Sequence, residues 1–383
     1  MLVSNTPFAV ASFPIVPYKK NCQPAFVDNS LKKDTVSFSG RTGNFLDKKA
    51  TSLMHGFKQE LFVLLMSEKP VAENFKWLTS CIFKDFKFEL KDIKEVKYPD
   101  IIANPPTVFA KNTFGQSSPH TNLFLNFDRI TKIRNNAADP RVHFAKYTEE
   151  IAQCVASSNE YHFISNVVDE FTQELTQIKN INKESVSKII QKLNDKHKLD
   201  LNFKITDSEA VPGLPASHSA KLQISSSGEI HSELFIDFAK SEDELRTVLP
   251  HEFTHLLGIN SIELQNYKSN FSSKEVGHLV RKHQQGLADI LENNYNFLSL
   301  PTKVRKEKYD ELLRAIIKDN KGKNSQEVIS FIEKMSRDET LAYCKTPKDT
   351  PFAQEEATLL HVFKDFYNYI LAVKYDASKF PST

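Results

Sequence analysis

The chain is organised around residues 241–258, SEDELRTVLPHEFTHLLG, a stretch that predicts a single amphipathic helix. Its first four residues fit a capping box, in which a serine and a glutamate satisfy the first backbone N–H groups of a helix. Apolar residues then recur at helical spacing, and Gly258 is suited to end the helix. On this helix His251 and His255 lie one turn apart on the same face. We therefore expect the two imidazoles to reach one zinc ion.

Glu252 lies next to the first histidine and completes a His-Glu-x-x-His motif. In such a motif the glutamate is positioned to take a proton from a metal-bound water, so we assign Glu252 as the general base. Pro250 precedes the motif and removes one helical hydrogen bond. Two interpretations follow: the helix bends at Pro250, or a new helix begins there. Both keep the histidines one turn apart.

A third ligand is expected from the next helix, residues 272–297, because a catalytic zinc usually has three protein ligands. One face of this predicted helix is polar for five turns. That face carries Glu275, His278, Lys282, Gln285, Asp289 and Glu292. Glu275 falls in a second capping box that begins at Ser272, which explains it structurally. Of the others, His278 could bind zinc, although a surface histidine is the commoner interpretation, and with Tyr295 it is a weak candidate for an oxyanion donor.

Residues 248–255, VLPHEFTH, followed by residues 285–289, QGLAD, resemble the gluzincins, the thermolysin-like branch of zinc peptidases. The resemblance covers roughly residues 183–298. It implies that Gln285 stands at the position of the ligand glutamate and that Asp289 supports a ligand histidine or replaces Gln285. By family position, the expected site is His251, His255 and Gln285. Because a glutamine oxygen is neutral, Asp289 is kept as a helper or substitute ligand.

The resemblance implies hydrolysis of peptide bonds in a peptide or protein substrate, with Zn²⁺ as cofactor. It also implies that residues 231–238 form an edge strand that aligns an extended peptide. An alternative follows from Gln285: a degenerate zincin whose groove binds a peptide or partner protein without cleaving it. A third interpretation is a helical scaffold in which the motif is accidental.

The predicted fold class is α+β and mostly helical. It has a zincin-like core with a small mixed sheet, the motif helix and a downstream ligand helix, flanked by extra helices. Gly228 lies between the last two predicted strands, which fits a hairpin. The predicted divisions are a disordered tail (1–42), an N-terminal mostly helical region (43–140), a zincin-like metallopeptidase domain (141–300) and a C-terminal helical region (301–383).

Composition limits the function classes. A formal net charge of +2 offers no field for nucleic acid, and no run is long and apolar enough to span a membrane. The four cysteines contain no CxxC pair, which favours thiols in a reducing compartment. We therefore expect a cytoplasmic protein by default, with signal-less export as the alternative. Trp77 lies among phenylalanines and is expected in a core, and His283 is expected at the surface.

Overall fold

The computed structural model describes eleven stretches of the chain. They are residues 45–83, 87–96, 107–113, 120–199, 201–208, 218–224, 230–259, 271–293, 296–320, 322–346 and 351–374. The predicted tail, residues 1–42, lies outside the described residues.

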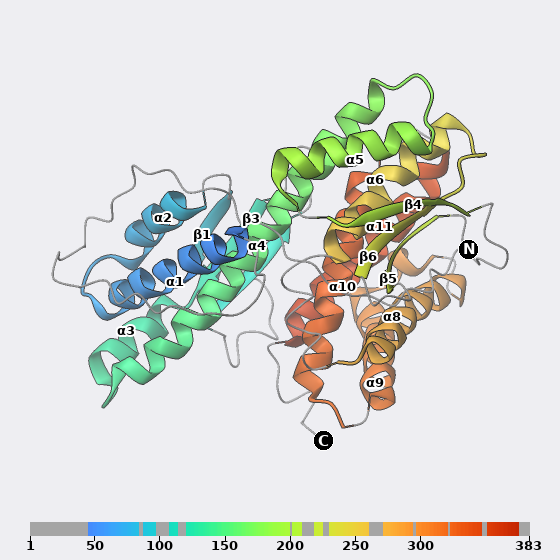
Figure 1. The fold of residues 1–383 in the computed structure, drawn as a ribbon. Helices are drawn as coiled ribbons and strands as arrows, with labels where there is room; N and C mark the ends of the chain where they lie inside the picture. Colours follow the sequence, from blue (N-terminus) through green and yellow to red (C-terminus); the bar gives the residue numbers. More distant parts are fainter. Residues whose placement is uncertain are drawn as a thin grey trace.

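Helices dominate both halves of the chain (Figure 1). The first half contains α1 (Phe45–Met66), α2 (Val71–Ile82), β1 (Phe88–Asp92), β2 (Val108–Thr113), β3 (His120–Leu125), α3 (Phe127–Asn136), α4 (Pro140–Thr176) and α5 (Lys183–His197). The second half contains β4 (Phe203–Asp207), β5 (Ser219–Ile224), β6 (Ile230–Ile236), α6 (Glu242–Ile259), α8 (Ser273–Asn293), α9 (Thr302–Asp319), α10 (Ser325–Lys345) and α11 (Pro351–Lys374). The predicted fold class, mostly helical with small mixed sheets, is confirmed at this level.

The strands form two small mixed sheets, each with three strands among the described residues. In the first, β3 is central, parallel to β1 and antiparallel to β2. In the second, β6 is central, parallel to β4 and antiparallel to β5. The pairing of Ile224 with Ile230 confirms the predicted hairpin. The prediction of an edge strand at 231–238 is wrong, because β6 forms hydrogen bonds with a neighbour on each side.

The long helix α4 belongs to two hydrophobic cores (Figure 1). Its first turns, from Phe144 to Val155, pack with α1, α2 and one side of the first sheet. Its later turns, from Tyr161 to Leu175, pack in a larger core with α5, α6 and α10. The predicted boundary at 140/141 therefore coincides with the start of α4, but the helix does not separate the two units. It joins them.

The second core extends across the predicted boundary at residue 300. Leu256 of α6 and Leu287 of α8 are fully buried in it together with Leu313, Phe331 and Phe366 from α9, α10 and α11. Described residues on the two sides of this boundary therefore share one core. The site described below depends on this packing.

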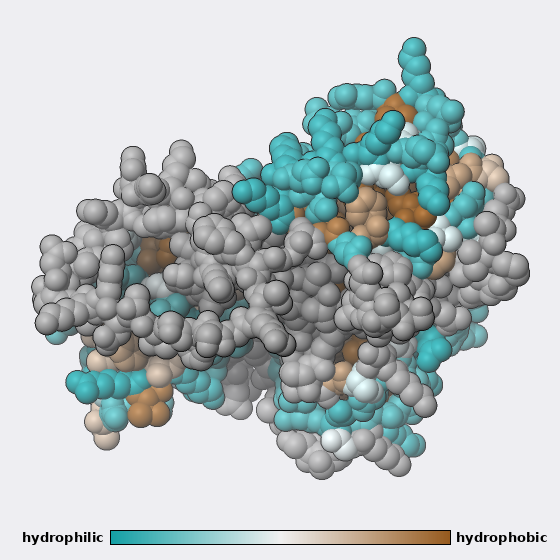
Figure 2. Space-filling model, in the orientation of Figure 1, coloured by the Kyte–Doolittle hydropathy of each residue, from teal (hydrophilic) through white to brown (hydrophobic). Residues whose placement is uncertain are grey.

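The surface agrees with the helical pattern. Over α5 the described side chains are mostly hydrophilic (Figure 2), as expected for a helix whose buried face consists of Val186, Ile189, Ile190 and Leu193. Among the described residues, none of the helices combines the length and apolar character that crossing a membrane requires.

Candidate metal centre

The motif lies on α6, which runs without interruption through Pro250. Thr254 Oγ1 donates a hydrogen bond of 2.8 Å to the Pro250 carbonyl, so the turn after the proline is intact. A new helix starting at Pro250 is therefore excluded. At the helix start, Glu244 N donates to Ser241 Oγ at 3.2 Å, which confirms half of the predicted capping box. Gly258 lies inside the helix and does not end it.

The two motif histidines converge. Nε2 of His251 lies 3.1 Å from Nε2 of His255, and the ring centroids are 4.8 Å apart at an interplanar angle of 76°. Both rings are partly buried, and each aims its Nε2 at the same point. The interpretation of an accidental motif expects two unrelated surface histidines, and this geometry speaks against it.

The third group at this point is Glu339, from α10. Its Oε2 lies 3.5 Å from Nε2 of His255, and one ligand atom from each of the three residues falls within 4.8 Å of the other two. Zinc bonds of about 2.0–2.1 Å at tetrahedral angles place neighbouring ligand atoms about 3.3 Å apart. The two distances to Nε2 of His255, 3.1 and 3.5 Å, bracket that value, and the ligand atoms of the third pair, His251 and Glu339, lie within 4.8 Å of each other. The residues present therefore fit a zinc ion, with two imidazoles and one carboxylate.

Gln285 and Asp289 lie elsewhere, and the carboxylate that the structure places beside the two histidines is that of Glu339. Gln285 is exposed, and its Nε2 donates a hydrogen bond of 2.6 Å to Asp289 Oδ1 on the outer face of α8. The preceding residue, Gln284, is the one that turns inward and donates to Glu339 Oε1 at 2.5 Å. One residue along a helix is a rotation of about 100°, which separates the two glutamines.

Each imidazole is held from behind by a residue of α10. Nδ1 of His255 donates to Oδ2 of Asp338 at 3.1 Å, which leaves Nε2 free to bind a metal. Nδ1 of His251 lies 3.5 Å from Thr346 Oγ1, and the Tyr343 ring packs edge-on against the His251 ring with centroids 4.6 Å apart. The carboxylate that contacts a histidine of the motif is thus Asp338, and not Asp289, for which that position was predicted.

Gly258 makes room for this support. A Cβ at that position would lie 3.0 Å from Cγ and 3.1 Å from Oδ2 of Asp338, and closer still to Oδ1. Only glycine lets α6 and α10 approach closely enough for the carboxylate to reach the histidine ring.

The three groups, His251, His255 and Glu339, differ in how their surroundings shift their pKa values. Burial, and then the charge of His255, lowers the pKa of His251 to about 3, so this imidazole is neutral at physiological pH. Burial also acts to lower the pKa of His255, but the Glu339 and Asp338 carboxylates outweigh it and raise that pKa well above the ordinary value. Burial alone would raise the pKa of Glu339, whereas the histidines, with the Gln284 hydrogen bond, lower it to about 2. Glu339 is therefore a carboxylate poised to face a cation.

The part of α10 that carries Asp338 and Glu339 was not predicted from the sequence as part of the site, because this stretch is charged and yet buried. Residues 331–342 are buried without a gap, which covers every face of the helix. This stretch includes Lys334 and Arg337, which lie over the Tyr161 ring of α4 at 5.4 and 3.9 Å. A usable signal was present, since apolar residues occupy all sides of α10 and leave no face for solvated charges.

The remaining predicted candidates lie apart from the histidine pair. Glu275 accepts hydrogen bonds from Ser272 N and Oγ at 2.7 and 2.8 Å, which confirms the second capping box. His278 is exposed beside Asp319, and Tyr295 lies outside the described residues. His283, predicted at the surface, is fully buried: its ring packs against Phe363 and Phe366, and its Nε2 lies 2.9 Å from Ser336 Oγ.

Comparison of the chain with protein-family models, with curated proteins and with solved structures finds no match. The resemblance to gluzincins therefore remains a prediction from the motif.

Proposed function

We propose that the protein is a zinc-dependent peptidase of the gluzincin type, with His251, His255 and Glu339 as ligands and Glu252 as general base. The observation that carries the proposal is the convergence of two imidazole Nε2 atoms and one carboxylate, at spacings that match a tetrahedral zinc site. The glutamate comes from α10 and follows His255 by 84 positions.

His251, His255 and Glu339 would hold a zinc ion, which would supply Lewis acidity toward a water and a peptide carbonyl. Glu252 follows His251 on α6, and its carboxylate accepts the proton of the attacking water and passes it to the nitrogen of the departing amine. Asp338 keeps the proton of His255 on Nδ1. Gln284 holds Oε1 of Glu339, which leaves Oε2 for the metal.

An extended peptide substrate aligns with an edge of the second sheet by backbone pairing. Since β6 is central, the free edges among the described strands belong to β4 and β5. Of these, β5 contacts α6, the helix that carries the motif, so β5 is the better candidate for this pairing.

The alternative function, a zincin that binds a peptide without cleaving it, was motivated by a glutamine in the ligand position. Because Glu339 lies beside the histidines and Gln285 lies on the outer face of α8, the glutamine no longer supports that alternative. A complete ligand set together with Glu252 favours hydrolysis.

Two measurements on the full chain test the proposal. The first is the zinc content and zinc affinity of the wild type, Glu339→Gln and the matched control Gln285→Glu. We expect one zinc per chain in the wild type, and an affinity at least 100-fold weaker in Glu339→Gln, since the site loses its only charged ligand. Gln285→Glu places a carboxylate where the sequence resemblance expects one, and we expect it to leave affinity unchanged.

The second measurement is cleavage of a peptide library by the wild type and Glu252→Gln, at zinc saturation. We expect Glu252→Gln to keep its zinc and to lose hydrolysis by at least 100-fold. Zinc bound equally well by Glu339→Gln would overturn the ligand assignment. Full hydrolysis by Glu252→Gln would exclude Glu252 as the base.

A further inference from the structure

A histidine lies fully buried behind the metal centre without belonging to its ligand set. His283, on α8, is completely shielded from solvent, and its ring packs against Phe363 and Phe366 of α11, with a centroid distance of 5.6 Å to each. An apolar side chain would fill this aromatic slot without the desolvation of an imidazole. A polar ring in such surroundings therefore calls for a physical explanation.

The hydrogen bonds around His283 determine which of its two nitrogens carries the proton. Burial lowers the pKa of His283 to about 4, although the Glu339 carboxylate acts in the opposite direction, so the ring is neutral at physiological pH and has a single N–H. Ser336 Oγ lies 2.9 Å from Nε2 and uses its own hydrogen to donate to the Ile332 carbonyl at 2.8 Å. Nε2 is therefore the donor and the serine oxygen the acceptor. Nδ1 has no hydrogen-bond partner among the described residues.

The bond from His283 connects α8 to the helix that carries the third ligand. His283 and Gln284 are consecutive on α8 and bond to Ser336 and Glu339 of α10, which lie three positions, or about 4.5 Å, apart along the helix axis. One attachment point would let α10 rotate about it, whereas two points nearly one turn apart fix both its rotation and its axial position. The placement of Glu339 Oε2, 3.5 Å from Nε2 of His255, depends on both.

We infer that His283 is a positioning residue for the metal centre: its hydrogen bond to Ser336 holds α10 where the Glu339 carboxylate meets the histidine pair. The inference rests on the proposed zinc site and adds a residue that lies beyond the ligands and their direct partners. A site of this kind needs its ligand atoms held to within about 0.5 Å by surrounding hydrogen bonds and packing. A buried polar contact between two helices selects one relative arrangement over others that apolar packing would also allow.

Replacement of the imidazole by an apolar side chain separates positioning from packing. In His283→Leu the slot between Phe363 and Phe366 stays filled and the unpaired Nδ1 disappears, so we expect the urea midpoint of the second core to stay at or above the wild-type value. Zinc affinity, measured on the full chain by chelator competition, should fall about 10-fold. With Co²⁺ in place of zinc, the visible absorption band depends on the number and arrangement of ligand atoms, and it should weaken and shift in this variant.

Two further variants control for the change of side chain. His283→Gln is the conservative variant, because its amide N–H can replace the Nε2–H donor, and it should restore most of the zinc affinity and the wild-type cobalt spectrum. His162→Leu is the matched control, because His162 is also buried and its Nε2 also lies 2.9 Å from a hydroxyl oxygen, Oγ1 of Thr121. It should leave the zinc affinity and the cobalt spectrum unchanged.

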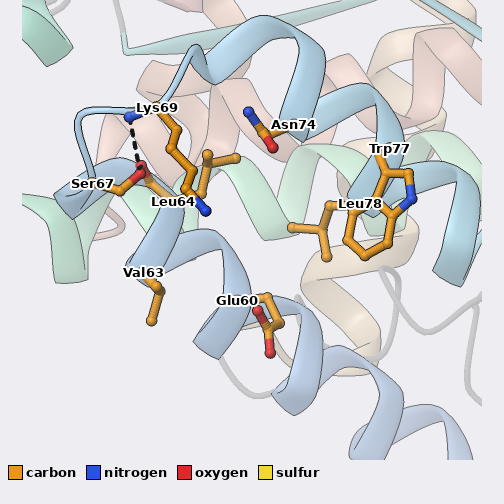
Figure 3. Close-up of a pocket in the computed structure, with 8 residues that line it drawn as sticks. All are labelled: Glu60, Val63, Leu64, Ser67, Lys69, Asn74, Trp77 and Leu78. Carbon is orange, nitrogen blue, oxygen red and sulfur yellow. Dashed lines mark hydrogen bonds between the residues drawn. The ribbon is translucent and has the colours of Figure 1, made fainter. Parts of the chain in front are cut away.

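The single tryptophan distinguishes the two cores in the unfolding experiment. Trp77, which the sequence predicted in a core, is 37% exposed at a hollow of about 110 Å³ between α1 and α2, beside Leu64 and Leu78 of the first core (Figure 3). Its fluorescence therefore follows the first core, whereas far-UV circular dichroism follows the whole chain. The fluorescence transition should be the same in His283→Leu and the wild type, because the substitution lies in the second core.

The outcomes separate this inference from the proposed function. Wild-type zinc affinity with an unchanged cobalt spectrum in His283→Leu would overturn the inference and leave the zinc site intact. A fall in both second-core stability and zinc affinity, without recovery in His283→Gln, would also overturn it, because that result assigns His283 a packing role alone. A wild-type chain that binds neither zinc nor cobalt would reject the proposed function, and the inference with it.

Discussion

Gly258→Ala tests whether the close approach of α6 to α10 controls metal binding. Helix propensity alone favours the alanine by about 0.5–1 kcal/mol, because Gly258 lies inside α6. The new Cβ, however, would lie 3.0 Å from Cγ of Asp338, and even nearer to Oδ1. The carboxylate must therefore retreat by about 0.5–1 Å. Its hydrogen bond to His255 Nδ1 is already 3.1 Å long, so a retreat of that size breaks it.

Loss of such a support behind a ligand histidine weakens metal affinity by about 10- to 100-fold, or roughly 1.4–2.8 kcal/mol. We expect that loss for Gly258→Ala when zinc affinity is measured by competition with a chromophoric chelator. Asp338→Asn should lose a similar amount. Gly56→Ala is the matched control, because a Cβ there meets no atom within 4 Å, and it should raise Tm and leave zinc affinity unchanged. A folded Gly258→Ala protein with wild-type zinc affinity would refute the reasoning.

Three further predictions concern stability. Burial lowers the pKa of His162 to about 4, so its contribution to stability is complete above the ordinary value of 6.5 and is lost as pH falls toward 4; in urea unfolding this histidine alone should account for about 2 kcal/mol of the stability lost between pH 7.5 and pH 5, and His162→Gln should lose about 2 kcal/mol less than the wild type over that range. Arg337→Met should lower the free energy of unfolding by about 3–5 kcal/mol, since Arg337 is buried between α4 and α10. The matched substitution of an exposed arginine, Arg314→Met, should change the free energy of unfolding in urea by less than about 1 kcal/mol. A chain ending at Leu300 should lose the thermal transition of the second core, because α9–α11 complete that core, and should keep only a transition of the first core, whose buried residues all precede residue 156; a transition like that of the full chain would contradict this.

The parts of the site that could be predicted from the sequence are those set by local periodicity. His251 and His255 share a face of α6 because four residues make about one turn, and the structure brings their Nε2 atoms within 3.1 Å of each other. The capping box at Ser272 and the hairpin of β5 and β6 follow from equally short-range rules.

The third ligand depends on tertiary packing, which short-range rules do not contain. Asp338 and Glu339 lie in a charged stretch that a sequence pattern assigns to solvent, and only the packing of α10 against α4, α6 and α8 places them beside the histidines. The resemblance pointed to α8, whereas the carboxylate beside the histidines comes from α10; on α8, Gln284 donates a hydrogen bond to that carboxylate and Gln285 does not. The prediction of an edge strand at β6 was wrong for a related reason: the alternation of side chains within one strand does not reveal how many neighbouring strands it has.

The wide separation of His255 and Glu339 along the chain has a consequence for biosynthesis. A ribosome that adds about 5–20 residues per second releases both imidazoles roughly 4–17 s before it reaches the carboxylate 84 positions later. During that interval the nascent polypeptide lacks a complete zinc-binding set, and so do all prematurely terminated products that stop before α10. A peptidase with this ligand set would therefore become competent only after most of its length has been translated.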